Sequence, residues 1–219
     1  MTQTHRDPDW RPIVTALARD HRAPGHIIVD LDGSRFASLP HAVVSQLGLR
    51  TGAELAPPGL DRLTAEADAE GAYSVALRLV AARPRAEGEL RQRLREKGHN
   101  SAATDRAIDR LRERGVLNDA EFVQHFVRVR SSRGHGASRL IADLRSRGVD
   151  GRLAERLVAE TLQEEGADEG AQMRRLAERR LSQLGSLPIK TKRRRMLAYL
   201  GRRGYRGAEV LKVLNELLG

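Results

Sequence analysis

Cysteine is absent from the 219 residues of this chain. This absence excludes disulfide bonds, zinc sites built on thiolates and thiol catalysis, and it is compatible with a reducing cytosol. Residues 1–20 are polar and charged and lack the apolar core of a secretory signal peptide. No run of about 18 apolar residues is present, so the sequence contains no candidate membrane span. We therefore expect a cytoplasmic protein.

Aromatic residues are also scarce, at 3% of the chain. The core must therefore come mainly from Leu, Val, Ile and Ala, which favours helices over a β-sandwich. Lysine is rare too: four residues (Lys97, Lys190, Lys192 and Lys212) stand among 39 basic ones, and the rest are arginine. A GC-rich genome accounts for part of this bias. The net charge of +10 nevertheless indicates a polyanionic partner or an acidic protein surface.

The charge is distributed unevenly along the chain. Residues 1–71 carry seven arginines and ten acids, a net charge of −3. Residues 72–219 carry 32 basic and 19 acidic side chains, a net charge of +13, which together with −3 gives +10. An asymmetry of this size predicts two parts with different roles.

The acidic part contains the strand signals of the sequence. Residues 26–31 form a β-branched run that ends in Asp32-Gly33, a strong tight-turn dipeptide. Residues 35–39 follow as a returning strand, and Pro40 begins a short helical segment through Leu47. We therefore predict a small β-hairpin plus helix over residues 25–59.

Two segments flank this hairpin. We expect residues 1–24 to form a flexible tail. Ala56-Pro57-Pro58-Gly59 is a cluster of helix breakers, and it predicts a joint before the helical part of the chain.

One helical pattern then recurs three times. An apolar residue, a leucine four positions later and a glycine four positions after that appear in each copy, with basic residues just before the glycine. The three copies are Leu90-Leu94-Gly98, Leu140-Leu144-Gly148 and Met196-Leu200-Gly204. Apolar residues four positions apart lie on one helix face, and the glycine supplies a left-handed C-cap. The pattern predicts a repeated helical unit.

Each copy has an apolar helical segment before and after it, so each unit should contain three helices. We place the three repeats at residues 60–119, 120–167 and 168–219. The fold class is therefore mostly α, with three tandem three-helix repeats in an elongated curved stack, preceded by a small β-hairpin/helix segment. A compact bundle of nine helices is the alternative.

Catalytic and cofactor motifs are missing. The seven histidines show no metal-binding spacing, and no phosphate loop ending in Gly-Lys-Ser/Thr is present. Gly134-His135-Gly136 begins like a dinucleotide fingerprint, but Arg139 stands where the third glycine belongs. We therefore expect no catalytic residue, no metal site and no cofactor, and interpret the chain as a binding protein rather than an enzyme.

Basic side chains are the candidate binding residues. Arg83 and Arg133 each lie 15 positions before a capping glycine, so the repeats predict a basic stripe that docks on phosphates or on an acidic protein groove. A solvated helix face balanced by nearby acids is the alternative for any single arginine. The candidate partner-binding residues are Arg83, Arg85, Arg91, Arg95, Lys97, Arg130, Arg133, Arg139, Arg145, Arg147, Lys192, Arg193, Arg194, Arg202 and Arg203.

These motifs resemble the RecX family of bacterial recombination regulators. The resemblance lies in Arg83-Pro84-Arg85 with Leu90 and Gly98, in Gly115-Val116-Leu117-Asn118-Asp119, and in Arg133-Gly134-His135-Gly136 with Arg147-Gly148-Val149. It covers residues 72–219, and residues 25–57 are similar to the short N-terminal β segment of many members. Two departures are Asn118, where the family tends to have an acid, and a long basic insertion before Met196.

The resemblance implies a partner, the RecA recombinase filament on single-stranded DNA. Family members lie in the helical groove of that filament, inhibit ATP hydrolysis and strand exchange, and promote filament disassembly. This implies a negative regulator of homologous recombination and DNA repair, with weak direct DNA contact and a monomeric free state. The alternative hypothesis is a basic helical-repeat protein that binds DNA or RNA directly, since three-helix units resemble helix-turn-helix modules.

Overall fold

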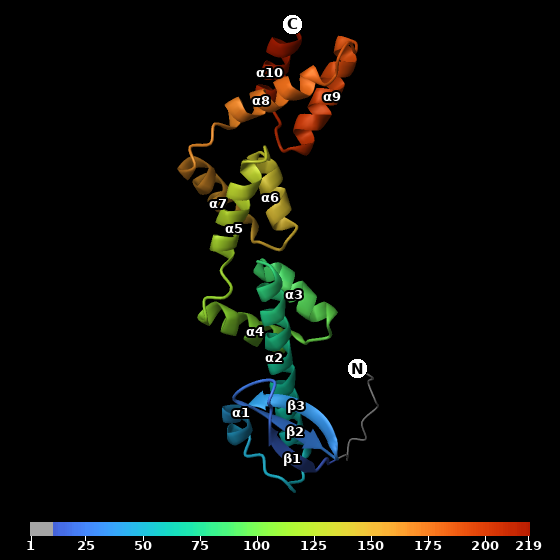
Figure 1. The fold of residues 1–219 in the computed structure, drawn as a ribbon, viewed down its shortest axis with the longest axis vertical. Coiled ribbons are helices and arrows are strands. Elements are labelled where there is room, and N and C mark those ends of the chain that lie inside the picture. Colours follow the sequence, from blue (N-terminus) through green and yellow to red (C-terminus); the bar gives the residue numbers. More distant parts are fainter. Residues whose placement is uncertain (1–10) are drawn as a thin grey trace. The chain divides into compact units, whose positions relative to one another are not determined.

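The computed structural model describes residues 11–219 and is mostly helical, with one small β-sheet near the N-terminus (Figure 1). Contacts divide the chain into two compact units. The first unit holds the described part of Met1–Arg83 together with Leu90–Leu117, and the second holds Pro84–Glu89 with Asn118–Gly219. Two hydrophobic clusters lie in each unit.

The sheet has three antiparallel strands in the order β1-β2-β3, namely β1 (Val14–Arg19), β2 (His26–Leu31) and β3 (Ser34–Pro40). The predicted turn between β2 and β3 is confirmed, because Asp32 and Gly33 both have positive φ, at 50° and 77°.

Two predictions about the N-terminal segment are wrong, because strand β1 is present there. The expected hairpin is a three-stranded sheet, and the expected flexible tail 1–24 contains a strand; residues 1–10 lie outside the described part. The short run around Val14 forms a strand because β2 supplies its hydrogen bonds and the Val14 side chain is fully buried beneath the sheet. Its sequence alone carries a weak strand signal.

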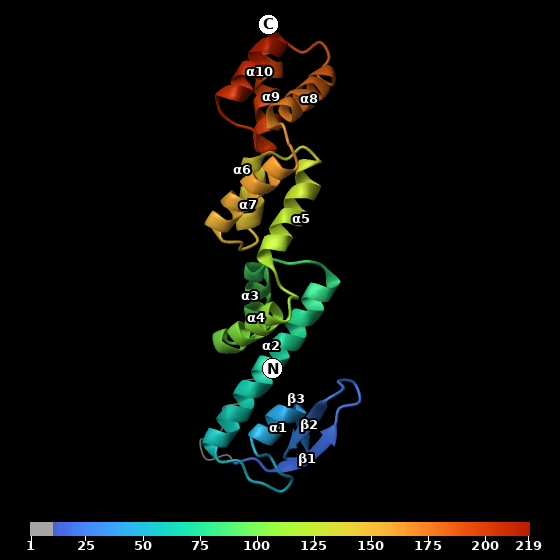
Figure 2. The ribbon, with the colours of Figure 1, turned by 90° about the vertical axis from the view of Figure 1, so that its left-hand side faces the viewer.

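The joint predicted at residues 56–59 is wrong, because a continuous helix, α2 (Pro57–Ala82), begins there. Pro57 and Pro58 occupy the first positions of this helix, where a proline loses no hydrogen bond. Leu60 and Leu63 complete the core of the sheet, which helix α1 (His41–Gln46) also covers. Later turns of the same helix, around Tyr73, pack in the first repeat (Figure 2). The sheet segment therefore does not end at residue 59 but shares one continuous helix with the first repeat.

The three-helix repeats are present as predicted, while the elongated curved stack stays a prediction. The repeats use the second half of α2 and then α3 (Glu87–Glu96), α4 (Ser101–Glu113), α5 (Asp119–Ser131), α6 (Ala137–Arg145), α7 (Gly151–Glu164), α8 (Glu169–Ser182), α9 (Ile189–Arg202) and α10 (Ala208–Leu218). The paired apolar residues of all three copies are fully buried. Each repeat builds its own core around them.

The capping glycines also behave as predicted. Gly98, Gly148 and Gly204 have φ of 88°, 77° and 93°. In each copy the next residue donates its N–H to the carbonyl of the leucine four positions before the glycine, at 3.0–3.2 Å. This is the hydrogen bond of a left-handed helix end, and it ends the second helix of every repeat in the same way.

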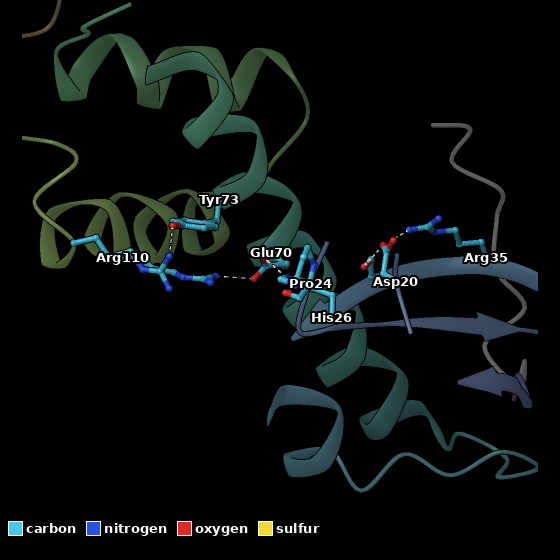
Figure 3. Close-up of polar contacts among 9 residues, drawn as sticks. Asp20, Pro24, His26, Arg35, Glu70, Tyr73 and Arg110 are labelled. Carbon is cyan, nitrogen blue, oxygen red and sulfur yellow. Dashed lines mark hydrogen bonds and ion pairs between the residues drawn. The ribbon is translucent and has the colours of Figure 1, made fainter. Parts of the chain in front are cut away.

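Asp20 fastens the turn between β1 and β2 onto the sheet (Figure 3). Its carboxylate accepts hydrogen bonds from the Ser38 hydroxyl at 2.6 Å, from the Arg22 backbone at 2.9 Å and from Arg35 at 2.9 Å. These donors, the Ser38 hydroxyl first, lower the pKa of Asp20 to about 2. The carboxylate is therefore ionised throughout the neutral range.

Glu70 joins the sheet to the first repeat within the first unit. It lies on α2 between His26 of β2 and Arg110 of α4, as Figure 3 shows. Its carboxylate contacts the His26 ring nitrogen at 3.2 Å and accepts from Arg110 at 2.6 Å, and only 13% of its side chain is exposed. The Arg110 guanidinium also lies over the Tyr73 ring, 3.7 Å from its centre. One carboxylate thus ties three elements together.

We expect Glu70→Gln to destabilise the first unit by about 1–2 kcal/mol, because Arg110 loses its charged partner at a largely buried position. Urea denaturation followed by circular dichroism measures the change. Glu66→Gln is the matched control: it removes the partner of Arg106, whose side chain is 54% exposed, and should cost about 0–1 kcal/mol. Equal losses in the two variants would contradict a special role for Glu70.

Candidate partner-binding surface

Consecutive repeats are joined by a carboxylate placed on a helix N-terminus. The Asp119 carboxylate accepts the Glu87 N–H at 2.8 Å, and the Glu169 carboxylate accepts the Ala137 N–H at 2.7 Å. Both pairs are separated by 32 residues. In each case the first residue of a helix, α5 or α8, caps the start of an earlier helix, α3 or α6, which is the second helix of its repeat. A carboxylate satisfies an otherwise unpaired N–H there and suits the positive end of the helix dipole.

The capping glycines supply the second half of each junction. A Cβ atom on Gly88 would lie 2.4 Å from the Gly148 carbonyl oxygen, and one on Gly204 would lie 2.5 Å from the Arg139 nitrogen. The end of the second helix in one repeat therefore touches the start of the second helix in the preceding repeat, backbone against backbone. Sequence reasoning assigned these glycines to C-caps and missed the contact. The signal that marks the junction is an acid 32 residues after each helix start that it caps, at Asp119 and Glu169.

The junction between the second and third repeats carries additional polar contacts. Arg203 donates to the Arg133 carbonyl at 2.7 Å, and its own carbonyl accepts the Gly136 N–H at 2.8 Å. The Tyr205 hydroxyl donates to the Gln172 side chain at 2.9 Å, and Gln172 donates to the Ser131 carbonyl at 2.7 Å. Burial raises the pKa of Tyr205 to about 12, so this donor keeps its proton at neutral pH. These bonds hold the loop before α6 in one conformation.

His135 sits in that loop, surrounded by positive charge. Burial lowers its pKa below the usual 6.5, and the charges of Arg130, Arg203 and Arg139 act in the same direction, opposed by Asp143. Its Nδ1 atom is buried and has no hydrogen-bond partner among the residues that the structure describes. The neutral ring is therefore favoured, and Arg130, Arg139 and Arg203 form a group that we call the junction arginines.

Aromatic rings hold several of the predicted arginines in place. Arg130 and Arg147 both lie over the Phe126 ring, 5.1 Å and 4.9 Å from its centre. Arg203 lies 5.1 Å from the centre of the Tyr199 ring. Arginine and aromatic side chains fixed in this way are enriched in protein interfaces, since little conformational freedom remains to be lost on binding. The sequence analysis named these arginines but not the rings.

Other predicted residues are paired inside the chain. Arg85 pairs with Glu89 and Arg91 with Asp105. Arg139 contacts Asp143 at 3.0 Å, and Arg193 donates to Asn215 at 2.7 Å. The partners of Arg85, Arg91 and Arg139 are acids, as on a balanced helix face, while the partner of Arg193 is the uncharged amide of Asn215; the binding role of all four stays a prediction.

A further group is free to meet a partner. Within residues 11–219, no ion pair joins the charged groups of Arg95, Lys97, Arg133, Arg145, Lys192, Arg194 or Arg202 to an acid, and all but the half-buried Lys192 are exposed. Arg83 and Arg133 follow the last turns of α2 and α5, so they occupy matching places in the first two repeats. They belong to different units, and the continuous stripe through them stays a prediction.

Helix α9 concentrates the unbalanced charge. Its 14 residues include six cations and no acid, whereas α3 has three of each. Lys190, Arg194, Arg195 and Arg202 are exposed on it. The structured part of the chain contains no group of three or more His, Asp or Glu side chains that could hold a metal ion, and none of its helices is long and apolar enough to cross a membrane. The exposed and unbalanced cations of α9 are suited to electrostatic binding of a macromolecule.

The close backbone contact between Gly148 and Gly88 leads to a prediction about the stability of glycine variants. We expect Gly148→Ala to destabilise the second unit by about 1–3 kcal/mol more than Gly98→Ala destabilises the first, because a methyl group meets the Gly88 backbone. Both positions have positive φ, so both variants carry a conformational cost of about 1–2 kcal/mol. Only Gly98 has open space around it. Urea denaturation measures the difference, and equal losses would show that Gly148 serves only as a C-cap.

The half-buried His135 leads to a prediction about the pH dependence of stability. Because the folded pKa of His135 is lowered, the unfolded chain takes up its proton first, at about pH 6.5. Stability from the neutral ring is present above that pH and is lost as the pH falls below it. We expect His135→Gln to reduce the loss of stability between about pH 7.5 and about pH 5.5. Urea midpoints at the two pH values measure it, with His125→Gln, exposed on α5, as the control. An unchanged pH dependence in His135→Gln would contradict the assignment.

Comparisons with known proteins agree with this architecture. The model of the first RecX three-helix domain matches residues 72–111, and that of the second matches residues 118–157. A solved structure described as regulatory protein RecX is similar with a TM-score of 0.70 at 17% identity, covering 94% of this chain and 99% of that one. RecX from Lactobacillus salivarius is similar with a TM-score of 0.57 at 18% identity, covering 68% and 96%. These structures support the fold.

Relatives at higher identity identify the family. The regulatory protein RecX of Amycolatopsis mediterranei is 34% identical over 148 residues, covering 67% of this chain and 83% of the relative. That of Pelodictyon phaeoclathratiforme is 31% identical over 152 residues, covering 69% and 91%. Both are named regulatory proteins. The match spans two three-helix domains and most of each relative, and the chain therefore belongs to the RecX family of regulatory proteins.

Proposed function

We propose that the protein negatively regulates homologous recombination and DNA repair by binding the RecA filament on single-stranded DNA. It lies in the helical groove of the filament, inhibits ATP hydrolysis and strand exchange, and promotes disassembly. The observation that carries this proposal is a RecX-family array of helical repeats whose basic side chains are in part fixed by aromatic rings and in part left without an acidic partner.

The two kinds of basic side chain support two steps of binding. Exposed cations such as Arg194 and Arg202 attract an acidic surface over a distance and raise the association rate. Arg147 and Arg203 are already ordered on Phe126 and Tyr199, so they lose little entropy when a partner covers them. A filament groove lined by many identical subunits offers a repeated surface to which a protein built of repeats is suited.

Direct nucleic-acid binding is the second candidate. The six cations of α9, with no acid among them, favour it because each phosphate contact releases a counterion. The aromatic rings weigh against it. Phe126 and Tyr199 already carry guanidinium groups on their faces, so they are poor platforms for stacking bases. A steep fall of DNA affinity with salt, in the absence of any recombinase, would favour this candidate.

The test is DNA-dependent ATP hydrolysis by a preformed RecA filament while the protein is titrated in. We expect inhibition by the unaltered chain, and Arg194→Glu/Arg195→Glu to need about tenfold more protein for the same effect. Arg62→Glu/Arg152→Glu is the control, since it changes the net charge equally at exposed residues outside the candidate set. No inhibition at any ratio would overturn the proposal, and equal weakening by both double variants would reduce the effect to net charge.

A further inference from the structure

The outer face of α9 combines charge with exposed aliphatic side chains. Ile189 is 59% exposed and Leu197 is 39% exposed, while Met196 and Leu200 of the same helix are fully buried in the third repeat. Lys190 and Arg194 lie one turn apart on the exposed side. We call Ile189, Lys190, Arg194 and Leu197 the α9 face.

In the other two repeats, the N-terminus of the second helix contacts an acidic side chain. The backbone N–H groups of the first residues of α3 and α6 donate to the carboxylates of Asp119 and Glu169. These two acids are themselves the first residues of α5 and α8. No acid lies in the first turn of α9, and no side chain caps it. Counted from Met196, the residue of α9 that corresponds to Glu87 and Ala137 is Arg193, so the first turn of α9 is an extension that α3 and α6 lack, and its Ile189 and Lys190 side chains are exposed.

Charge and apolar area together select the class of occupant. Four cations on α9, Lys190, Arg194, Arg195 and Arg202, are exposed and have no acid on their own helix to balance them. A phosphodiester backbone would satisfy the cations but offers nothing to the aliphatic side chains of Ile189 and Leu197. Burying those side chains is favourable only against apolar groups. A protein segment that carries both acids and aliphatic residues satisfies the whole face.

From these observations we infer that the α9 face docks an acidic, leucine- or isoleucine-bearing protein segment. The inference rests on the proposed function, because it assigns the α9 cations of that binding surface to protein rather than to phosphate. The acids of this segment pair with Lys190 and Arg194, and its aliphatic side chains cover Ile189 and Leu197.

Fluorescence anisotropy with the full-length chain tests this assignment. The probes are a labelled helical peptide rich in glutamate and leucine, the same peptide with its leucines replaced by serine, and a thymidine oligonucleotide of equal charge. We expect the leucine peptide to bind most tightly. Ile189→Ser/Leu197→Ser should weaken its binding about tenfold without changing the salt dependence. Leu211→Ser, at a residue 47% exposed on α10, should leave the binding unchanged.

Three outcomes would overturn the inference. They are tighter binding of the oligonucleotide than of the leucine peptide, equal binding of the two peptides, and no binding of any probe. Lys190→Gln/Arg194→Gln should weaken peptide binding and reduce its salt dependence, which separates the contribution of charge from that of apolar contact. Circular dichroism confirms that each variant is folded.

Recombinase assays with the same variants separate this inference from the proposed function. If the peptide fails to bind while filament ATP hydrolysis is still inhibited, the assignment of α9 is wrong and the proposed function stands. If the peptide binds through the α9 face while ATP hydrolysis is unaffected at any protein ratio, the docking surface stands and its partner is not the recombinase filament.

Discussion

The repeat architecture depends on contacts between helix ends. The carboxylates of Asp119 and Glu169, at the first residues of α5 and α8, accept the backbone N–H groups at the starts of α3 and α6, and a capping glycine brings two backbones together. Neither contact works alone. The carboxylate fixes which helix end is met, and the glycine allows the close approach that a Cβ atom would prevent.

The distribution of positive charge follows from these contacts. At the junction between the second and third repeats, Arg203 binds the loop carbonyls and the ring of Tyr199, and burial together with the junction arginines lowers the pKa of His135. These arginines contribute to structure as well as to surface charge. Helix α9 is different, since none of its cations has an acid on the same helix. A regulator that acts by binding needs both kinds, because fixed groups give specificity and exposed charge gives speed.

The fold tolerates wide sequence divergence for a physical reason. A solved RecX structure shares it at 17% identity. What a three-helix repeat requires is apolar residues at helical spacing and a glycine at the helix end, and many sequences meet that requirement. Surface residues are less constrained by packing, so charge on a helix such as α9 can change without loss of the fold. The sheet segment is tied on by Glu70, whose carboxylate reaches both β2 and α4.

The sequence by itself determined the elements whose signals are local. Leu90, Leu140 and Met196, each with a leucine and a glycine at fixed distances, specified the buried face and the end of the second helix in every repeat. Asp32-Gly33 specified its turn. Local signals of this kind depend only on helical or strand periodicity and on backbone conformation.

The tertiary structure decided what depends on distant partners. Strand β1 exists because β2 pairs with it, and Pro57 begins a helix because Leu60 and Leu63 bury their side chains against the sheet. It also decided which arginines are available. Arg91 and Arg139 find acids, Arg203 finds backbone carbonyls, and Arg194 finds neither. Arginines thus differ in their contacts, because hydrogen bonds and ion pairs depend on distances that only the folded chain defines.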